Sequence, residues 1–124
     1  MNSENDFIII KSLGRYLFLR PQQVDWVVAE GNYVRVYCQE KHYLVRETLK
    51  EICKRLDSTQ FVRINRSVVL NIRQIKEVKQ KRNSVFEVRV GDGRVWNWSE
   101  GYRANLDHLL RKRLSCKNVD AQVV

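Results

Sequence analysis

The residues best suited to binding chemistry lie near the centre of the chain, in the run FVRINRSVVLN at positions 61 to 71. Apolar residues dominate this run, yet Arg63, Asn65, Arg66 and Ser67 interrupt it. Arginine pairs bidentately with guanine edges or phosphate, asparagine can pair with adenine, and a serine hydroxyl suits phosphate. Such groups are costly to bury without partners, so they must reach water or a ligand. The run therefore predicts a loop held by apolar flanks, whose polar tip touches a nucleic acid.

The distribution of charge points to the same segment. The chain of 124 residues has a formal net charge of +9, and residues 61–82 alone, with seven basic residues and one acidic residue, contribute +6. A concentration of this kind predicts a basic patch that neutralises phosphates and makes affinity fall with salt. An alternative is that its lysines only protect an exposed strand edge from unwanted pairing. The expected phosphate contacts in this stretch are Arg63, Lys76, Lys79, Lys81 and Arg82.

Catalysis is not expected from this sequence. Only His42 and His108 could act in proton transfer, and there is no GxSxG, HExxH or glycine-rich phosphate loop. The three cysteines, Cys38, Cys53 and Cys116, have neither disulfide-framework nor zinc-site spacing, and the first two read as small buried hydrophobes. We therefore predict no enzyme activity, no metal and no cofactor.

The elements that must position the central run are mostly short strands. Period-2 patterns and turn residues predict hairpins within residues 7–20, across Gly31-Asn32, and across the GDG turn at 91–93, with a further strand at 42–46, while residues 75–81 are ambiguous. A short helix over about 49–56 is predicted to begin with a capping box of Thr48 and Glu51, and a final helix is predicted to be capped by Ser99.

These elements predict a mainly β fold, an antiparallel architecture of about seven to ten short strands with two short helices. The expected organisation is a tail at 1–6, one domain at 7–114 and a tail at 115–124. No apolar run is long enough to cross a membrane, and the N-terminus lacks the basic end of a secretory signal. We therefore expect a cytoplasmic protein without a membrane partner.

Several blocks of the sequence resemble the LytTR family of bacterial DNA-binding domains. The blocks occur in the family's order over roughly residues 7–110. They are VDWVVAEGNY at 24–33, RETLKEICKRL at 46–56, FVRINRSVVLN at 61–71 with Ile75, and WSEGY at 98–102. The resemblance implies an elongated β fold that grips duplex DNA with loops, usually as the output domain of a response regulator in a two-component system, often on paired direct repeats. A homodimer on DNA is therefore expected.

The resemblance also implies which residues contact DNA. It places base contacts in three loops, here Gly31 to Tyr33, Asn65 to Ser67, and the start of the last helix. Asn65 stands where the family commonly has His, and Glu100-Gly101 stands where a basic residue is usual. At that third site, either Glu100 accepts from a cytosine amino group, or it turns away as a helix-start charge, or Arg103 takes over the contact. The expected base contacts are Asn32, Tyr33, Asn65 and Arg66, and phosphate contacts from Ser67, Ser99 and Arg103 join the basic residues named above.

Two other functions fit the residues alone. An RNA-binding β module could stack unpaired bases on Tyr33, Tyr37, Trp96 and Trp98. A protein-interaction domain could use the basic face against an acidic partner. The family usually carries a receiver or membrane sensor ahead of this domain, so we expect either an excised output domain or a protein that acts without phosphorylation.

Overall fold

The secondary structure is mainly β, as predicted. The computed structural model describes residues 7–83 and 85–114, and the predicted tails lie outside them. Within those residues the chain forms ten strands and two α-helices. The strands are β1 (Ile8–Ser12), β2 (Arg15–Leu19), β3 (Trp26–Glu30), β4 (Tyr33–Cys38), β5 (Lys41–Val45), β6 (Phe61–Asn65), β7 (Val68–Asn71), β8 (Ile75–Gln80), β9 (Phe86–Val90) and β10 (Val95–Trp98). The helices are α1 (Leu49–Cys53) and α2 (Arg103–Leu114), with 3-10 turns η2 (Pro21–Gln23), η3 (Ile72–Gln74) and η4 (Glu100–Tyr102).

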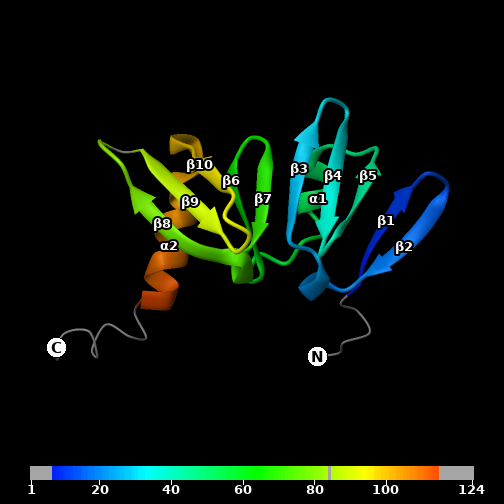
Figure 1. Ribbon diagram of the computed structural model, residues 1–124, viewed down its shortest axis with the longest axis horizontal. Coiled ribbons are helices and arrows are strands. Elements are labelled where there is room, and N and C mark those ends of the chain that lie inside the picture. Colours follow the sequence, from blue (N-terminus) through cyan, green and yellow to red (C-terminus); the bar gives the residue numbers. More distant parts are fainter. Residues whose placement is uncertain (1–6, 84, 115–124) are drawn as a thin grey trace.

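The strands form three antiparallel sheets that follow one another along the long axis of the molecule (Figure 1). The hairpin β1-β2 stands at one end, the five-stranded sheet β5-β4-β3-β7-β6 occupies the centre, and the sheet β10-β9-β8 stands at the other end. The shape is elongated because each sheet packs against the next, and no single sheet closes on itself.

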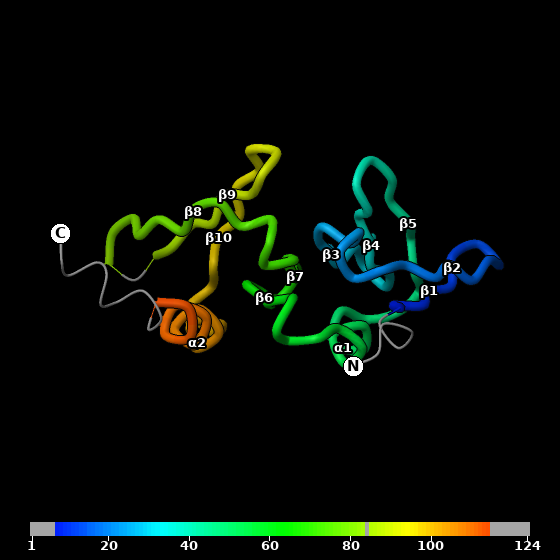
Figure 2. The backbone as a smooth tube through the Cα atoms, turned by 90° about the horizontal axis from the view of Figure 1, so that it is seen from below, coloured from blue at the N-terminus to red at the C-terminus, as the bar shows by residue number. Residues whose placement is uncertain are grey.

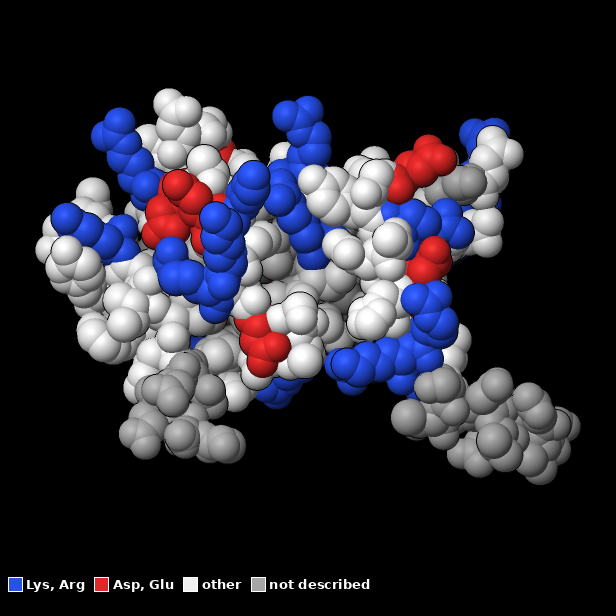
Figure 3. Space-filling model, turned by 180° about the vertical axis from the view of Figure 1, so that it is seen from behind, with Lys and Arg blue, Asp and Glu red and all other residues white. Residues whose placement is uncertain are grey.

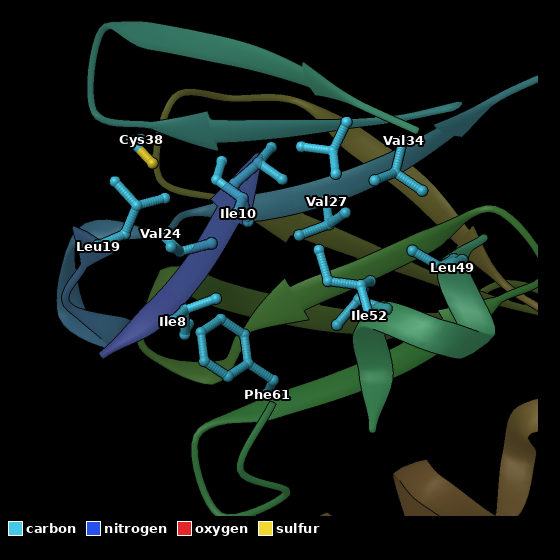
Figure 4. Packing of buried hydrophobic residues seen from close by; sticks show 13 residues of the cluster. Ile8, Ile10, Leu19, Val24, Val27, Val34, Cys38, Leu49, Ile52 and Phe61 are labelled. Carbon is cyan, nitrogen blue, oxygen red and sulfur yellow. The ribbon is translucent and has the colours of Figure 1, made fainter. Parts of the chain in front are cut away.

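Two clusters of buried side chains hold these sheets together. One joins β1 and β2 to the central sheet and α1, and in Figure 4 the side chains of Ile10, Val27 and Ile52 point toward one another. The other joins the central sheet to β8, β9, β10 and α2, and it includes Leu70 and Val88. Strand β7 contributes to both clusters, so both of its faces are buried. This double burial explains why its sequence, VVLN, is almost continuously apolar.

Both helices lie on the same side of the molecule (Figure 2). The capping box predicted for α1 is present, since the Thr48 hydroxyl accepts a hydrogen bond from the Glu51 amide at 3.0 Å and the Glu51 carboxylate accepts one from the Thr48 amide at 2.9 Å. The helix ends at Cys53, three residues before the predicted end. Helix α2 follows η4, but Ser99 makes no side-chain capping hydrogen bond, so that detail of the prediction is wrong.

One asparagine of the central run serves the fold. Asn71 is buried, and its side-chain amide donates hydrogen bonds to the carbonyl oxygens of Val24 (2.9 Å) and Pro21 (3.3 Å), while its side-chain oxygen accepts one from the Arg73 amide. Its polar groups therefore find partners inside the protein.

Candidate nucleic-acid interface

Three connections lie along one long edge of the molecule, the upper edge in Figure 1. They are the β3–β4 turn, the β6–β7 turn and the β10–η4 junction, which contain Gly31-Asn32, Arg66-Ser67 and Ser99 respectively. The chain thus brings together, on one edge, the three loop regions that the sequence predicted to contact bases.

The β6–β7 turn is a two-residue connection stabilised by its own side chains. Asn65 pairs with Val68 across the hairpin, leaving Arg66 and Ser67 at the tip. The Asn65 side-chain oxygen accepts a hydrogen bond from the Ser67 amide at 2.8 Å, an arrangement in which asparagine mimics a backbone turn. The Ser67 carbonyl accepts a hydrogen bond from the Ala29 amide at 2.8 Å, which ties the tip to β3.

The two arginines of this segment have different surroundings. Arg63 is half-buried, and its guanidinium folds back to donate hydrogen bonds to the carbonyl oxygens of Arg66 (2.8 Å) and Asn65 (3.2 Å). Arg66 is exposed, and its guanidinium has no hydrogen bond or ion pair within the described part of the chain. Arg63 therefore braces the tip, and Arg66 is the cation that the tip presents.

A bulge joins this tip to the third connection. The register of β6 against β7 shifts between Arg63 and Asn65, so Ile64 has no partner in β7. The freed Ile64 carbonyl accepts a hydrogen bond from the Ser99 amide at 2.9 Å. The Asn65 side-chain amide donates one to the Asn97 carbonyl at 2.9 Å. Bulges often re-aim side chains beside functional sites, and this one couples the β6–β7 turn to the end of β10.

Helix α2 reinforces the same coupling. The Asn105 side-chain amide donates a hydrogen bond to the Arg63 carbonyl at 2.9 Å, and the Arg63 guanidinium lies 5.3 Å from the centre of the Tyr102 ring. Asn97, Tyr102 and Asn105 were missed as supports of the site. Each lies more than 30 positions along the sequence from its partner. Local sequence patterns do not predict contacts between residues so far apart.

The third connection offers less positive charge than predicted. Glu100 is exposed at its start. The Arg103 guanidinium stacks 4.1 Å from the centre of the Phe86 ring, and its Nε lies 3.6 Å from the Asp107 carboxylate. This connection thus presents the backbone around Ser99 together with the Glu100 carboxylate. The Arg103 guanidinium instead contacts Phe86 and Asp107 of the same domain.

The first connection is short and accessible. Gly31 has φ of +62°, a conformation that glycine adopts at little cost, and Asn32 and Tyr33 are exposed beside it. Behind the turn, Arg35 forms a bidentate ion pair with Glu30 at 2.7 and 2.9 Å, and this hydrogen bonding lowers the pKa of the Glu30 carboxyl. The ion pair links the two strands directly below the turn.

The predicted basic patch is divided between the β6–β7 tip and the end of the molecule at β8. Lys76, Lys79 and Arg82 are exposed, but Lys79 lies opposite Glu87 across the β8–β9 register. Lys81 approaches Glu87 at 3.6 Å. Figure 3 shows the molecule from the side opposite to that of Figure 1. On that side, Lys and Arg side chains are spread from end to end, with Asp and Glu among them. The surface thus carries a basic excess that acidic residues interrupt.

Burial and hydrogen bonding describe the surroundings of Cys38, Cys53 and His42 within the fold. Burial raises the pKa of the Cys38 thiol to about 11 and also raises that of the partly exposed Cys53. Arg35 Nη1 lies 2.9 Å from His42 Nδ1, which must accept because arginine can only donate. Among the described residues there is no cluster of three or more metal-ligating side chains, and no helix has the length and apolarity to cross a membrane.

A comparison with protein families identifies the class of this domain. The sequence profile described as the LytTr DNA-binding domain matches residues 14–111. This match covers most of the chain, including all three connections of the edge. The chain therefore belongs to the LytTR family of DNA-binding domains.

Individual relatives agree with this assignment. Sensory transduction protein LytT of Bacillus subtilis is 35% identical over 81 residues, which make up 65% of this chain and 34% of that protein. Transcriptional regulatory protein LytR of Staphylococcus aureus is 31% identical over 75 residues, 60% of this chain and 30% of that protein. The chain thus spans about a third of the length of these relatives.

The fold has a match among solved structures. The LytTr DNA-binding domain from Bacillus cereus superposes with a TM-score of 0.73 at 21% identity, covering 85% of this chain and 96% of that one. At this identity the likeness concerns the fold, and it confirms the predicted elongated, mainly antiparallel β architecture.

Proposed function

We propose that this chain is the sequence-specific DNA-binding domain of a bacterial transcriptional regulator, and that the three connections of its long edge enter successive grooves of duplex DNA. The observation that carries the proposal is the exposed Arg66 at the end of a braced hairpin, whose guanidinium has no partner among residues 7–83 and 85–114. A guanidinium held on a rigid tip loses little freedom on binding and can pair bidentately with a guanine edge. Transcriptional regulation is supported by the name of the LytR relative.

The proposed contacts divide by accessibility. Arg66, Asn32 and Tyr33 are exposed and read bases directly. Asn65 is also predicted to read a base, but its side-chain oxygen accepts from the Ser67 amide within the turn and its side-chain amide donates to the Asn97 carbonyl of β10, so it acts mainly by positioning Arg66. Arg63 likewise acts through the β6–β7 turn that it contacts, whereas Arg103 packs on the Phe86 ring of β9 and lies beside Asp107 of α2. Phosphate contacts come from Ser67, Lys76, Lys79, Lys81, Arg82 and Ser99.

Selection of bound duplexes from a random pool tests the function as a whole. At about 0.15 M salt, where exposed charges are screened beyond about 8 Å, a recurring short element is expected. We further propose that the element occurs as a direct repeat occupied by two copies of the domain in the cytoplasm, in a regulator whose signal enters through a receiver or sensor domain. A pool that yields no recurring element would reject sequence-specific recognition.

The role of Arg66 is tested by a matched pair of variants. Arg66→Ala is expected to weaken binding to the selected duplex by about 1–3 kcal/mol and to relax preference at one base pair. Arg73→Ala is the control, because Arg73 is also exposed but follows β7, at the end of that strand opposite the tip. An unchanged ratio of selected to random duplex binding in Arg66→Ala would exclude Arg66 as a base reader.

The RNA-binding alternative is less well supported. Of the four aromatic residues that could stack unpaired bases, Trp98 is buried, and Tyr37 and Trp96 pack against Trp26 with ring centres 6.1 and 5.3 Å apart. Tyr33 alone among the four is exposed. Tighter binding to single-stranded RNA than to the selected duplex would nevertheless favour this alternative.

A further inference from the structure

A cleft opens between α1 and α2, on the side of the molecule that carries both helices (Figure 2). Its volume is about 270 Å³, just below the range of about 300–1,000 Å³ that is usual for small-molecule sites. Apolar side chains form much of its lining, among them Cys53, Leu56, Phe61, Val69, Ile72 and Leu109. The cleft can therefore hold a small apolar body.

The position of the cleft follows from the way in which the helices cover the core. Helix α1 packs in the first core cluster through Leu49 and Ile52, whereas α2 packs in the second through Leu106. Strands β6 and β7 contribute to both clusters, and Val69 of the first and Val62 of the second also line the cleft. The cleft thus lies along the boundary between the two clusters.

The charged groups of the lining are basic. Arg63, Lys112 and Arg113 line the cleft, and none of the described residues that line it is acidic. Arg113 reaches across from α2, since its Nη2 donates a hydrogen bond to the Thr59 carbonyl at 3.5 Å. The pKa of the neighbouring Asp57 carboxyl is lowered mainly by its hydrogen bonds with Thr59 and also by the charge of Lys112. The cleft therefore favours an anion, and its apolar lining favours a singly charged one, because a second charge costs more to desolvate.

Arg63 connects the cleft to the proposed DNA-binding edge. It pairs with Val69 across β6 and β7, and both residues line the cleft. Burial raises the pKa of the Cys53 thiol in the cleft, and the charge of Arg63 opposes this rise, so the guanidinium lies near enough to act there. The same guanidinium donates hydrogen bonds to the carbonyl oxygens of Asn65 and Arg66 at the tip. An anion that engages Arg63 from the cleft therefore competes with the tip.

We propose that the cleft binds a small monocarboxylate with a compact apolar body, and that this ligand weakens DNA binding. The apolar body covers Leu56 and Leu109, and the carboxylate pairs with Arg113 and Arg63. A charged acceptor forms a stronger hydrogen bond than a backbone carbonyl does, so the carboxylate draws Arg63 away from the tip carbonyls and loosens the tip. The effect on DNA rests on the proposed function, whereas binding of the ligand does not.

The test uses 2-naphthoate and its neutral counterpart 2-naphthamide, which share the same apolar body. NMR amide shifts on addition of 2-naphthoate to the full chain are expected around Cys53, Phe61 and Leu109, and at Arg66 and Ser67 in the tip. Its affinity should exceed that of 2-naphthamide about tenfold, because hydrogen bonds to a charged group are about twice as strong as neutral ones. Equal binding of the two compounds, or shifts confined to β8 or to the long edge, would overturn the proposal.

Two other occupants of the cleft give different results in the same spectra. Cleft amides that shift with protein concentration alone would make a second copy of the chain the occupant. Nuclear Overhauser contacts between the cleft and residues 115–124 in the ligand-free protein would make that segment the occupant. Either result would refute a site for a small anion.

A matched pair of α2 variants tests the role of charge. Arg113→Gln removes one positive charge from the cleft and should weaken 2-naphthoate binding about threefold, as expected for an exposed ion pair, without changing 2-naphthamide binding. Arg111→Gln is the control, because Arg111 is also exposed on α2 but is not among the described residues that line the cleft. An equal loss in both variants, or no loss in Arg113→Gln, would contradict the proposed contact.

The coupling to DNA is measured separately, with the selected duplex at constant salt. Saturating 2-naphthoate should weaken duplex binding about fivefold or more, and by linkage the duplex should weaken 2-naphthoate binding by the same factor. An unchanged duplex affinity with 2-naphthoate bound in the cleft would refute the coupling. If the chain selects no duplex at all, the proposed function fails, while the NMR shifts in the cleft and the tip still decide whether the ligand binds and loosens the tip.

Discussion

Asn65 offers the sharpest test of how the edge works, because its two possible roles predict different measurements. Asn65→Ala removes the hydrogen bond from the Ser67 amide (2.8 Å) and the one to the Asn97 carbonyl (2.9 Å). Hydrogen bonds contribute about 0.5–1.5 kcal/mol each, and this half-buried site belongs at the lower end, so the free energy of unfolding should fall by about 1–2 kcal/mol. Urea denaturation measures this loss.

The same change should weaken DNA binding through Arg66. Once the tip is no longer fixed, ordering it on DNA costs about 1–2 kcal/mol, which corresponds to about a 5- to 30-fold weaker dissociation constant. Fluorescence anisotropy with the selected duplex measures the dissociation constant. In an Arg66→Ala background the additional effect of Asn65→Ala should be small, because a residue that acts through another shows non-additive effects.

The control for this experiment is Asn97→Ala. The Asn97 side chain is exposed, whereas its backbone carbonyl, which accepts from Asn65, is retained in the variant. Stability and DNA affinity should therefore stay close to the original values. The positioning role is refuted if Asn65→Ala keeps full stability, loses preference at one base pair, and adds its full effect to that of Arg66→Ala.

Three further predictions concern charge, titration and capping. Lys79→Ala should weaken binding to all duplexes alike and reduce the slope of log affinity against log salt by about 1, and an unchanged slope would show that Lys79 meets no phosphate. Folding raises the pKa of Cys38 from 9.0 to about 11, so the folded state binds the proton more tightly and stability is lost as pH rises from about 9 to 11. The free energy of unfolding of Cys38→Ala should fall by about 2 kcal/mol less than that of the original chain over this range. An equal fall in the two proteins would contradict the burial argument. Thr48→Ala should cost about 1 kcal/mol of stability through the lost cap of α1, and Thr48→Ser should restore most of it.

Much of the fold was predictable from local patterns. Alternation in β4 and glycine at position 31 predicted the β3–β4 hairpin, and Thr48 with Glu51 predicted the start of α1. These features depend on residues within a few positions of one another, so the sequence alone carries them. The length of α1 was overestimated, because the apolar stripe continues past Cys53 while the helix does not.

The ambiguous segment at 75–81 needed tertiary information. Its sequence shows no clear alternation of apolar and polar residues, because exposed lysines interrupt it. The segment forms strand β8 because Val78 packs in the second core cluster and its backbone pairs with β9. A bulge near Ile75 further obscures the alternation in its sequence. Pairing with a partner strand therefore decided its conformation.

The sequence by itself determined that an arginine- and asparagine-rich tip would stand on apolar strands, since the residue types and their spacing demand a loop whose polar groups find partners. Only the tertiary structure decided which group does which task. Arg63 turns back to brace the loop, Asn65 binds a carbonyl 32 positions away, and Arg66 is exposed without a partner in the part of the chain that the structure describes. The physical reason is that a hydrogen-bonding group takes the nearest partner in space, and the bulge of β6 together with the packing of β10 sets those distances.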